Sequence, residues 1–316
     1  MRSFLASLSL LLASVASAQT VPTMVKLPTG SELATWSIMP TTEPRKTAII
    51  FLHGGPGLYT EARRFDEGEV FRKAGFSTLY FDQVGGGKSG RIPATEYRLN
   101  RLVEDLEALR KAKGQDKILL WGNSFGASLA TVYADRYPSR VAGLIFTSPG
   151  MYPGFDGKRD HSTTNSGKVT IGKPLSSAIG KIDREGGAAE AKLSQAEAGK
   201  LLDELVAAEL MDGMTCKGSS VQTAPLTGGG NLYAQRAVFR DLKKLTFNPQ
   251  PVTGIPTLVI RGSCDFVPYE SAEKYIRHFN GKMDMIEGSG HGLLENRAAV
   301  DRSIAAFLTG TLAGVP

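Results

Sequence analysis

LLWGNSFGASLA, residues 119–130, decides the fold that this sequence predicts. The apolar residues up to Trp121 indicate a short buried strand, and the apolar positions from Ala127 onward indicate a helix. Between them, Gly122-Asn-Ser-Phe-Gly126 matches the pattern G-x-S-x-G. A serine on so tight a strand-to-helix turn is held in a strained backbone conformation, and small glycines let neighbouring chain pass close by. Ser124 is therefore a candidate nucleophile; the alternative is an ordinary strand–glycine–helix turn.

The rest of the chain alternates between apolar, β-branched runs and helical patterns. The clearest helix carries leucines and a valine on one stripe, from Leu99 to Leu109. Such alternation is typical of a mostly parallel sheet that is covered by helices on both faces, so the predicted fold class is α/β. The expected strands are residues 47–52, 77–82, 117–121, 141–147, 257–261 and 283–287, preceded by a hairpin of residues 24–27 and 33–38.

The alternation of strand and helix patterns stops between residues 150 and 250, where Gly, Ser, Lys and Thr are frequent. One good helix is predicted there. Ser194 and Glu197 form a capping box at its start, and apolar residues as far as Leu210 follow on one face. We predict that residues 150–250 are a mostly helical cap inserted into a core formed by residues 19–149 and 251–316.

The first residues predict export. Arg2 is followed by an apolar stretch and then by Ala16-Ser17-Ala18, which has the form of a signal-peptidase site. We expect cleavage after Ala18 and a secreted or periplasmic protein that begins at Gln19. The apolar stretch is too short for a stable membrane span, and no later stretch is long and apolar enough, so no membrane span is expected.

Composition narrows the choice of partners and cofactors. The 316 residues include 37 Lys and Arg against 31 Asp and Glu, a formal net charge of +6. These charges are interspersed, and no basic cluster with interleaved aromatic residues occurs, so we expect no nucleic-acid partner. The two cysteines, Cys216 and Cys264, cannot form a zinc site by themselves. Either a disulfide or two buried free thiols would fit them, and the sequence leaves that choice open, as it does the oligomeric state.

A serine nucleophile needs a general base, an acid that orients the base, and hydrogen-bond donors for the oxyanion. In an open parallel sheet of this kind the order along the chain is Ser, acid, His. Asp265 follows the strand expected at residues 257–261, and His291 follows the strand expected at residues 283–287. Both loops should leave the same edge of the sheet as Ser124, and ligands gather at that edge.

Oxyanion donors are expected from the loop FLHGGPG, residues 51–57, and from the turn itself. The glycines of this loop leave backbone N–H groups uncovered, and Pro56 stiffens it. We predict that the N–H groups of Gly55 and Phe125 converge on one point. His53 is predicted to brace this turn rather than to act as the base.

The sequence resembles the α/β-hydrolase fold and, within it, the proline iminopeptidase-like serine hydrolases. The resemblance is carried by HGGPG at residues 53–57, by the loop DQVGGGKS at residues 82–89, by the elbow at residues 122–126, and by Asp265 and His291. It covers roughly residues 24–150 and 251–308. The resemblance implies catalysis by Ser124, His291 and Asp265 through an acyl-enzyme, without a metal or an organic cofactor.

The predicted cap departs from that family. Its aminopeptidases bind the free amino group of the substrate with cap glutamates, and one of these lies in a motif that resembles GGGNLYAQRAVF here. Asn231 and Tyr233 match the motif as candidate substrate-binding residues, but Gly230 stands in place of the glutamate. Other glutamates could substitute, although they lie in runs that read as solvated helix faces: Glu185, Glu190, Glu204 and Glu209.

Burying an ammonium group without a carboxylate is costly, so this departure favours a neutral substrate. The predicted function is hydrolysis of a small ester, lactone or amide, the substrate being a small molecule or a short peptide. The alternatives are a proline iminopeptidase, which would differ in its cap, and a non-catalytic binding protein that retains the hydrolase fold.

Overall fold

The computed structural model describes residues 21–155, 173–206, 211–221, 226, 228–247, 252 and 254–316. The predicted signal peptide and its cleavage site lie outside these described residues.

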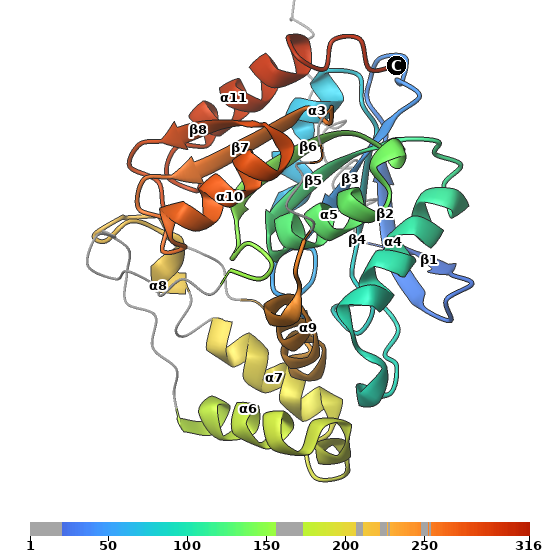
Figure 1. Cartoon of the computed structure of the whole chain (residues 1–316), viewed down its shortest axis with the longest axis vertical. Coiled ribbons are helices and arrows are strands. Elements are labelled where there is room, and N and C mark those ends of the chain that lie inside the picture. Colours follow the sequence, from blue (N-terminus) through green and yellow to red (C-terminus); the bar gives the residue numbers. More distant parts are fainter. Residues whose placement is uncertain are drawn as a thin grey trace, which may run out of the picture.

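In the described part of the chain, one sheet of eight strands has the order β1-β2-β4-β3-β5-β6-β7-β8 (Figure 1). β1 and β2 form the predicted antiparallel hairpin, β2 pairs antiparallel with β4, and the other pairs are parallel. Every predicted strand is confirmed, and β5 continues past Trp121 as far as Ser124. The strands are β1 (Thr23–Lys26), β2 (Glu32–Ile38), β3 (Ala48–Leu52), β4 (Thr78–Phe81), β5 (Ile118–Ser124), β6 (Val141–Pro149), β7 (Thr257–Gly262) and β8 (Lys282–Ile286).

The central strands are buried on both faces, which explains why they read as continuous apolar runs. On β3, Ile50 and Leu52 belong to one core, whereas Ile49 and Phe51 belong to the other. The helices α4 (Leu99–Ala112), α5 (Phe125–Arg136) and α10 (Tyr269–Phe279) pack on the first face. The helices α2 (Arg63–Glu67), α3 (Glu69–Lys73) and α11 (Arg297–Thr309) pack on the second. Short 3-10 helices η1 (Ala94–Glu96) and η2 (Pro138–Arg140) lie in connections.

Between β6 and β7 the structure describes α6 (Lys173–Glu185), η3 (Gly186–Ala191), α7 (Gln195–Leu205), α8 (Met211–Met214) and α9 (Leu232–Lys244). Figure 1 shows α6, α7 and α9 stacked beyond one end of the sheet. The predicted capping box is present: Ser194 Oγ accepts the Glu197 N–H, and the Glu197 carboxylate accepts the Ser194 N–H. Leu202 is buried below it, while Leu210 lies outside the described residues.

Cys216 and Cys264 form a disulfide, with their Cα atoms 5.3 Å apart. This is one of the two arrangements that the sequence left open. It joins the short segment after α8 to the loop that follows β7. None of the helices in the described ranges has the length and hydropathy that crossing a membrane requires.

Candidate active site

Ser124 lies at the sharp turn between β5 and α5, as the pattern predicts. Its backbone has φ 52° and ψ −119°, a conformation that residues with a side chain rarely adopt. The two glycines of the pattern are needed for close approach. A Cβ atom on Gly122 would lie 2.7 Å from the backbone of Ala127, and one on Gly126 would collide with the carbonyl oxygen of Leu52. The turn therefore holds Ser124 at the carboxyl end of a central strand.

The structure brings Ser124, His291 and Asp265 together in one hydrogen-bonded line. His291 Nε2 lies 3.0 Å from Ser124 Oγ, and His291 Nδ1 lies 2.8 Å from Asp265 Oδ1. Because a carboxylate oxygen only accepts, Nδ1 carries the proton, and Nε2 is left to accept the serine hydroxyl. Ser124 ends β5, and Asp265 and His291 lie in the loops that follow β7 and β8. These strands are parallel and so end at the same edge of the sheet.

The acid is shielded from water. Asp265 is 0% exposed and His291 is 3% exposed. The Val267 N–H donates to Asp265 Oδ1 over 2.9 Å, and the Phe266 ring lies 4.5 Å from the imidazole ring of His291. These neighbours fix the orientation of the carboxylate and of the imidazole.

The HGGPG loop lies directly against the turn. A Cβ atom on Gly54 would lie 3.2 Å from Ser124 Cβ, and Gly55 adopts φ 124°. Phe125 is the first residue of α5, where a backbone N–H has no acceptor within the helix. The loop that contains Gly55 therefore lies beside the first turn of α5, and the convergence of the Gly55 and Phe125 N–H groups stays a prediction.

His53 braces this loop, as predicted. Its Nδ1–H donates to the Gly54 carbonyl oxygen over 2.8 Å, and its Nε2 accepts the Gln83 N–H over 2.9 Å. Burial lowers the pKa of His53 to about 4. The ring is therefore neutral at neutral pH, and both of its nitrogens are engaged with backbone groups.

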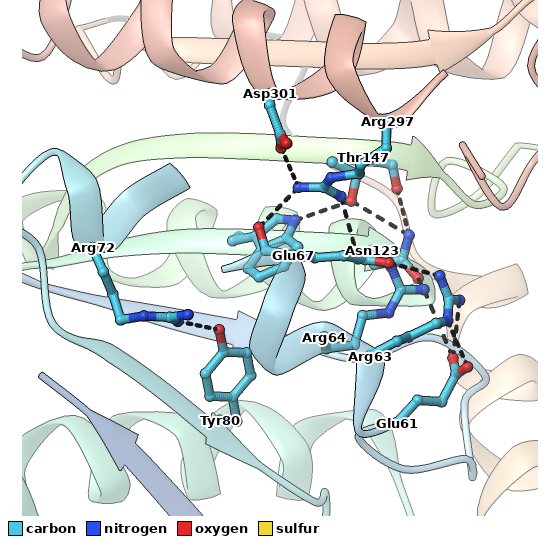
Figure 2. Close-up of polar contacts among 11 residues, drawn as sticks. Glu61, Arg63, Arg64, Glu67, Arg72, Tyr80, Asn123, Thr147, Arg297 and Asp301 are labelled. Carbon is cyan, nitrogen blue, oxygen red and sulfur yellow. Dashed lines mark hydrogen bonds and ion pairs between the residues drawn. The ribbon is translucent and has the colours of Figure 1, made fainter. Parts of the chain in front are cut away.

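One feature of the site was not predicted from the sequence: a buried arginine holds the residue before the nucleophile (Figure 2). Arg64 Nη2 donates to Asn123 Oδ1 over 2.9 Å. On its other side, Asn123 Nδ2 donates to the Thr147 carbonyl oxygen over 2.9 Å. The side-chain amide of Asn123 is thus held between α2 and β6. No periodicity signals this contact, because Arg64 stands in a charged run, EARRFDEGE, which is typical of a solvated surface.

Arg64 belongs to a charge cluster that links α2 to α11. Glu67 accepts hydrogen bonds from Arg63 and Arg64, at 2.7 and 2.6 Å, and Arg297 Nη1 lies 3.5 Å from its carboxylate. Burial raises the pKa of Glu67, but Arg64 and Arg63 lower it more, so the net shift is downward. The carboxylate therefore stays ionised and fixes the position of Arg64.

The predicted substrate-binding residues make structural contacts. Asn231 caps α9, since its Oδ1 accepts the Ala234 N–H over 3.0 Å, and its backbone N–H donates to the Gly57 carbonyl oxygen. The Tyr233 hydroxyl donates to the Leu193 carbonyl oxygen over 2.6 Å. Within the described ranges, no hydrogen bond connects Gly230, Asn231 or Tyr233 with the Ser–His–Asp line. Their bonds instead join the start of α9 to the HGGPG loop at Gly57, to the loop at Gly85 and to the segment before α7 at Leu193.

A carboxylate does lie beside Gly230, on a residue that the sequence analysis did not single out. Asp203 of α7 accepts the N–H groups of Gly229 and Gly230, at 3.0 and 2.9 Å. Burial raises the pKa of Asp203, against the opposing effects of these two N–H groups and of Arg91. A carboxylate of α7 thus lies next to Gly230, the position where the resembled motif has a glutamate.

No group of three or more His, Cys, Asp or Glu side chains that could hold a metal ion occurs among the residues that the structure describes.

Comparison with known proteins agrees with this geometry. A family model described as alpha/beta hydrolase fold matches residues 47–170. The proline iminopeptidase of Heyndrickxia coagulans is 37% identical over 110 residues, which are 33% of this chain and 35% of the relative. That of Neisseria gonorrhoeae is 38% identical over 105 residues, 32% of each chain. The matches therefore span about a third of the length of these curated relatives.

Solved structures are similar over nearly the whole chain. A thermophilic esterase from Thermogutta terrifontis has a TM-score of 0.63 at 20% identity, covering 91% of this chain and 98% of its own. A proline iminopeptidase-related protein from Thermus thermophilus has a TM-score of 0.59 at 23% identity, covering 91% and 97%. At these identities the likeness concerns the fold. Together with the sheet order and the family model, it shows that the chain has the α/β-hydrolase fold, and about a third of its sequence is similar to proline iminopeptidases.

Proposed function

We propose that this protein is a serine hydrolase that cleaves a small ester, lactone or amide through an acyl-enzyme. The observation that carries the proposal is the hydrogen-bonded line from Ser124 through His291 to Asp265 at the carboxyl edge of the sheet. A weak nucleophile, a base with a free lone pair and a buried acid are what acyl transfer requires.

In the proposed reaction, Ser124 Oγ attacks the substrate carbonyl carbon while His291 Nε2 accepts the hydroxyl proton. Asp265 stabilises the imidazolium that forms. The N–H groups of Gly55 and Phe125 would donate to the oxyanion of the tetrahedral intermediate. When the intermediate collapses, His291 gives the proton to the leaving group, and it then takes a proton from the water that hydrolyses the acyl-enzyme.

The test of this step is Ser124→Ala, which removes the nucleophile without adding bulk. We expect kcat to fall at least ~1000-fold while the far-UV circular dichroism stays unchanged. A fluorophosphonate probe should label the unmodified protein and leave Ser124→Ala unlabelled. Near-normal turnover by folded Ser124→Ala would refute the serine-hydrolase proposal, and absence of both labelling and turnover in the unmodified protein would favour a binding protein.

A neutral acyl group is the proposed substrate feature, because Gly230 supplies no carboxylate for a protonated amine. A second candidate, proline iminopeptidase activity, is favoured by two specific observations. The curated relatives with that name share 34–38% identity over a third of this chain. In addition, the carboxylate of Asp203 lies within hydrogen-bond distance of the Gly230 N–H.

The two candidates differ in how they treat a free amino group. If the first is correct, N-acetylated proline arylamide or a simple ester should have a higher kcat/KM than proline arylamide. A tenfold preference for the free amine would instead establish the iminopeptidase. In that case Asp203→Asn should abolish the preference, whereas Glu204→Gln, which changes an exposed carboxylate on the same helix, should not.

Export remains part of the proposal. The signal-peptide pattern at the N-terminus supports it, and so does the disulfide, because disulfides persist in oxidising compartments and are rare in the cytosol.

A further inference from the structure

A three-residue segment that begins at the last residue of α8, Met214–Cys216, touches the loops of both the base and the acid. On the side of the base it lies against the two glycines that flank His291. The Gly292 N–H donates to the Met214 carbonyl oxygen over 2.6 Å. A Cβ atom on Gly290 would come within 2.5 Å of that same oxygen and of the Thr215 Cα atom, so the segment packs directly on the backbone of the loop.

A carboxylate makes the second connection. Glu295 Oε1 accepts the Cys216 N–H over 2.6 Å, and Glu295 Oε2 accepts the Gly290 N–H over 3.2 Å. One half-buried side chain therefore joins the segment to the residue immediately before His291. Both N–H groups would lose a charged acceptor if this carboxylate were removed.

The disulfide makes the third connection, on the side of the acid. Cys216 is bonded to Cys264, which immediately precedes Asp265. The Cys264 N–H in turn donates to the carbonyl oxygen of Ser289, in the loop of the base. The segment, the acid loop and the base loop thus form one closed ring of contacts around the Asp265–His291 pair.

We infer that Met214–Cys216 is a positioning element for His291 and Asp265, and that its disulfide makes the hydrolase activity dependent on redox state. This inference rests on the proposed function. The loop of the base contains Gly288, Gly290 and Gly292 and has little stiffness of its own, so it depends on the contacts of the segment. A displacement of about 1 Å at a reacting group is enough to cost ~100-fold in rate.

The redox step is a thiol–disulfide exchange. A dithiol supplies two electrons and two protons, the Cys216–Cys264 bond breaks to give two thiols, and the dithiol closes to a cyclic disulfide. After that, the segment is held by its hydrogen bonds and packing contacts, without a covalent link to the acid loop. Because the displaced group is the base, which moves the proton during the reaction, we expect the loss to appear in kcat rather than in KM.

The experiment compares the oxidised full-length enzyme with enzyme treated with dithiothreitol and then alkylated. Because the chain has only two cysteines, the reagent has one target. We expect kcat to fall about tenfold with KM nearly unchanged, and reoxidation of unalkylated protein to restore it. The double variant Cys216→Ser with Cys264→Ser should show the same low kcat without treatment and no response to the dithiol.

A second variant leaves the disulfide in place. Glu295→Gln keeps the shape of the side chain but turns one acceptor into a donor, and we expect it to lower kcat severalfold with KM unchanged. Glu287→Gln is the matched control, because Glu287 is an exposed carboxylate at the end of β8, and it should retain full kcat.

Several results would overturn the inference. Reduced and alkylated protein that keeps wild-type kcat would do so, and so would a loss of kcat that is accompanied by loss of the folded circular dichroism spectrum, since the disulfide would then only stabilise the fold. If turnover does not depend on Ser124, the proposed function falls as well. If turnover depends on Ser124 but is unchanged by reduction and by Glu295→Gln, only the positioning role is refuted.

Discussion

Replacing His53 by glutamine should remove a specific part of the pH dependence of stability. His53, the first residue of the HGGPG loop, is buried with both ring nitrogens bonded to backbone groups, and burial lowers its pKa to about 4. Glutamine does not titrate, and its carbonyl oxygen can still accept the Gln83 N–H. The variant therefore isolates the cost of charging this one ring.

The magnitude follows from the difference between the two states. The unfolded chain binds a proton at His53 below about pH 6.5, whereas the folded protein resists until about pH 4. Burying the neutral ring therefore costs no stability above about pH 6.5, and stability is lost as the pH falls from there to about pH 4. At 1.36 kcal/mol per pKa unit, the loss amounts to about 3 kcal/mol between pH 7 and pH 4.

The assay is urea unfolding of both proteins at a series of pH values across that window. The stability of the unmodified protein relative to His53→Gln should decrease by about 3 kcal/mol toward acid. The contribution of Asp82 to stability changes with pH in the opposite direction, because burial raises its pKa to about 6. Both proteins contain Asp82, so its contribution cancels in the difference between them. Parallel stability curves for the two proteins would refute the reasoning.

Three further predictions concern the turn and the N-terminus. Asn123→Ala should lower kcat with KM unchanged and cost about 1–3 kcal/mol, because it leaves a donor of buried Arg64 unpaired; an unchanged kcat by steady-state assay would contradict this. Gly126→Ala should destabilise the fold by at least ~1 kcal/mol in urea unfolding, since the new methyl group meets a backbone carbonyl, whereas Gly180→Ala in α6 should be neutral or stabilising. Intact-mass measurement of protein from its natural compartment should find Gln19 as the first residue, and a retained Met1 would count against export.

The sequence predicted the strands and the Ser–His–Asp line for a physical reason. Strands buried on both faces are continuous apolar runs, and parallel strands end at one edge, so the loops that follow them must meet there. Ser124, Asp265 and His291 could therefore be brought together from their positions along the chain alone.

The contacts that support this line could not be predicted in that way. Arg64 reaches Asn123, Asp203 reaches Gly230, and Glu295 reaches Cys216, each across a distance in the chain that no local pattern reports. They depend on how loops approach one another after the sheet has formed. Charged residues within polar runs give the same pattern whether they are solvated or buried in the folded protein, so the sequence does not indicate the role of Arg64.

The position of the strands in the sheet has a consequence for motion. β5, which carries the nucleophile, has a hydrogen-bonded strand on each side. Among the strands that the structure describes, β8, which leads to His291, pairs with β7 alone, and most of its side chains are exposed. Backbone amides of β8 should exchange with deuterium faster than those of β5, because an edge opens at lower free energy than the centre. We therefore expect Ser124 to be held more rigidly by its strand than His291 is by β8, which agrees with the need of the base loop for the contacts of Met214–Cys216.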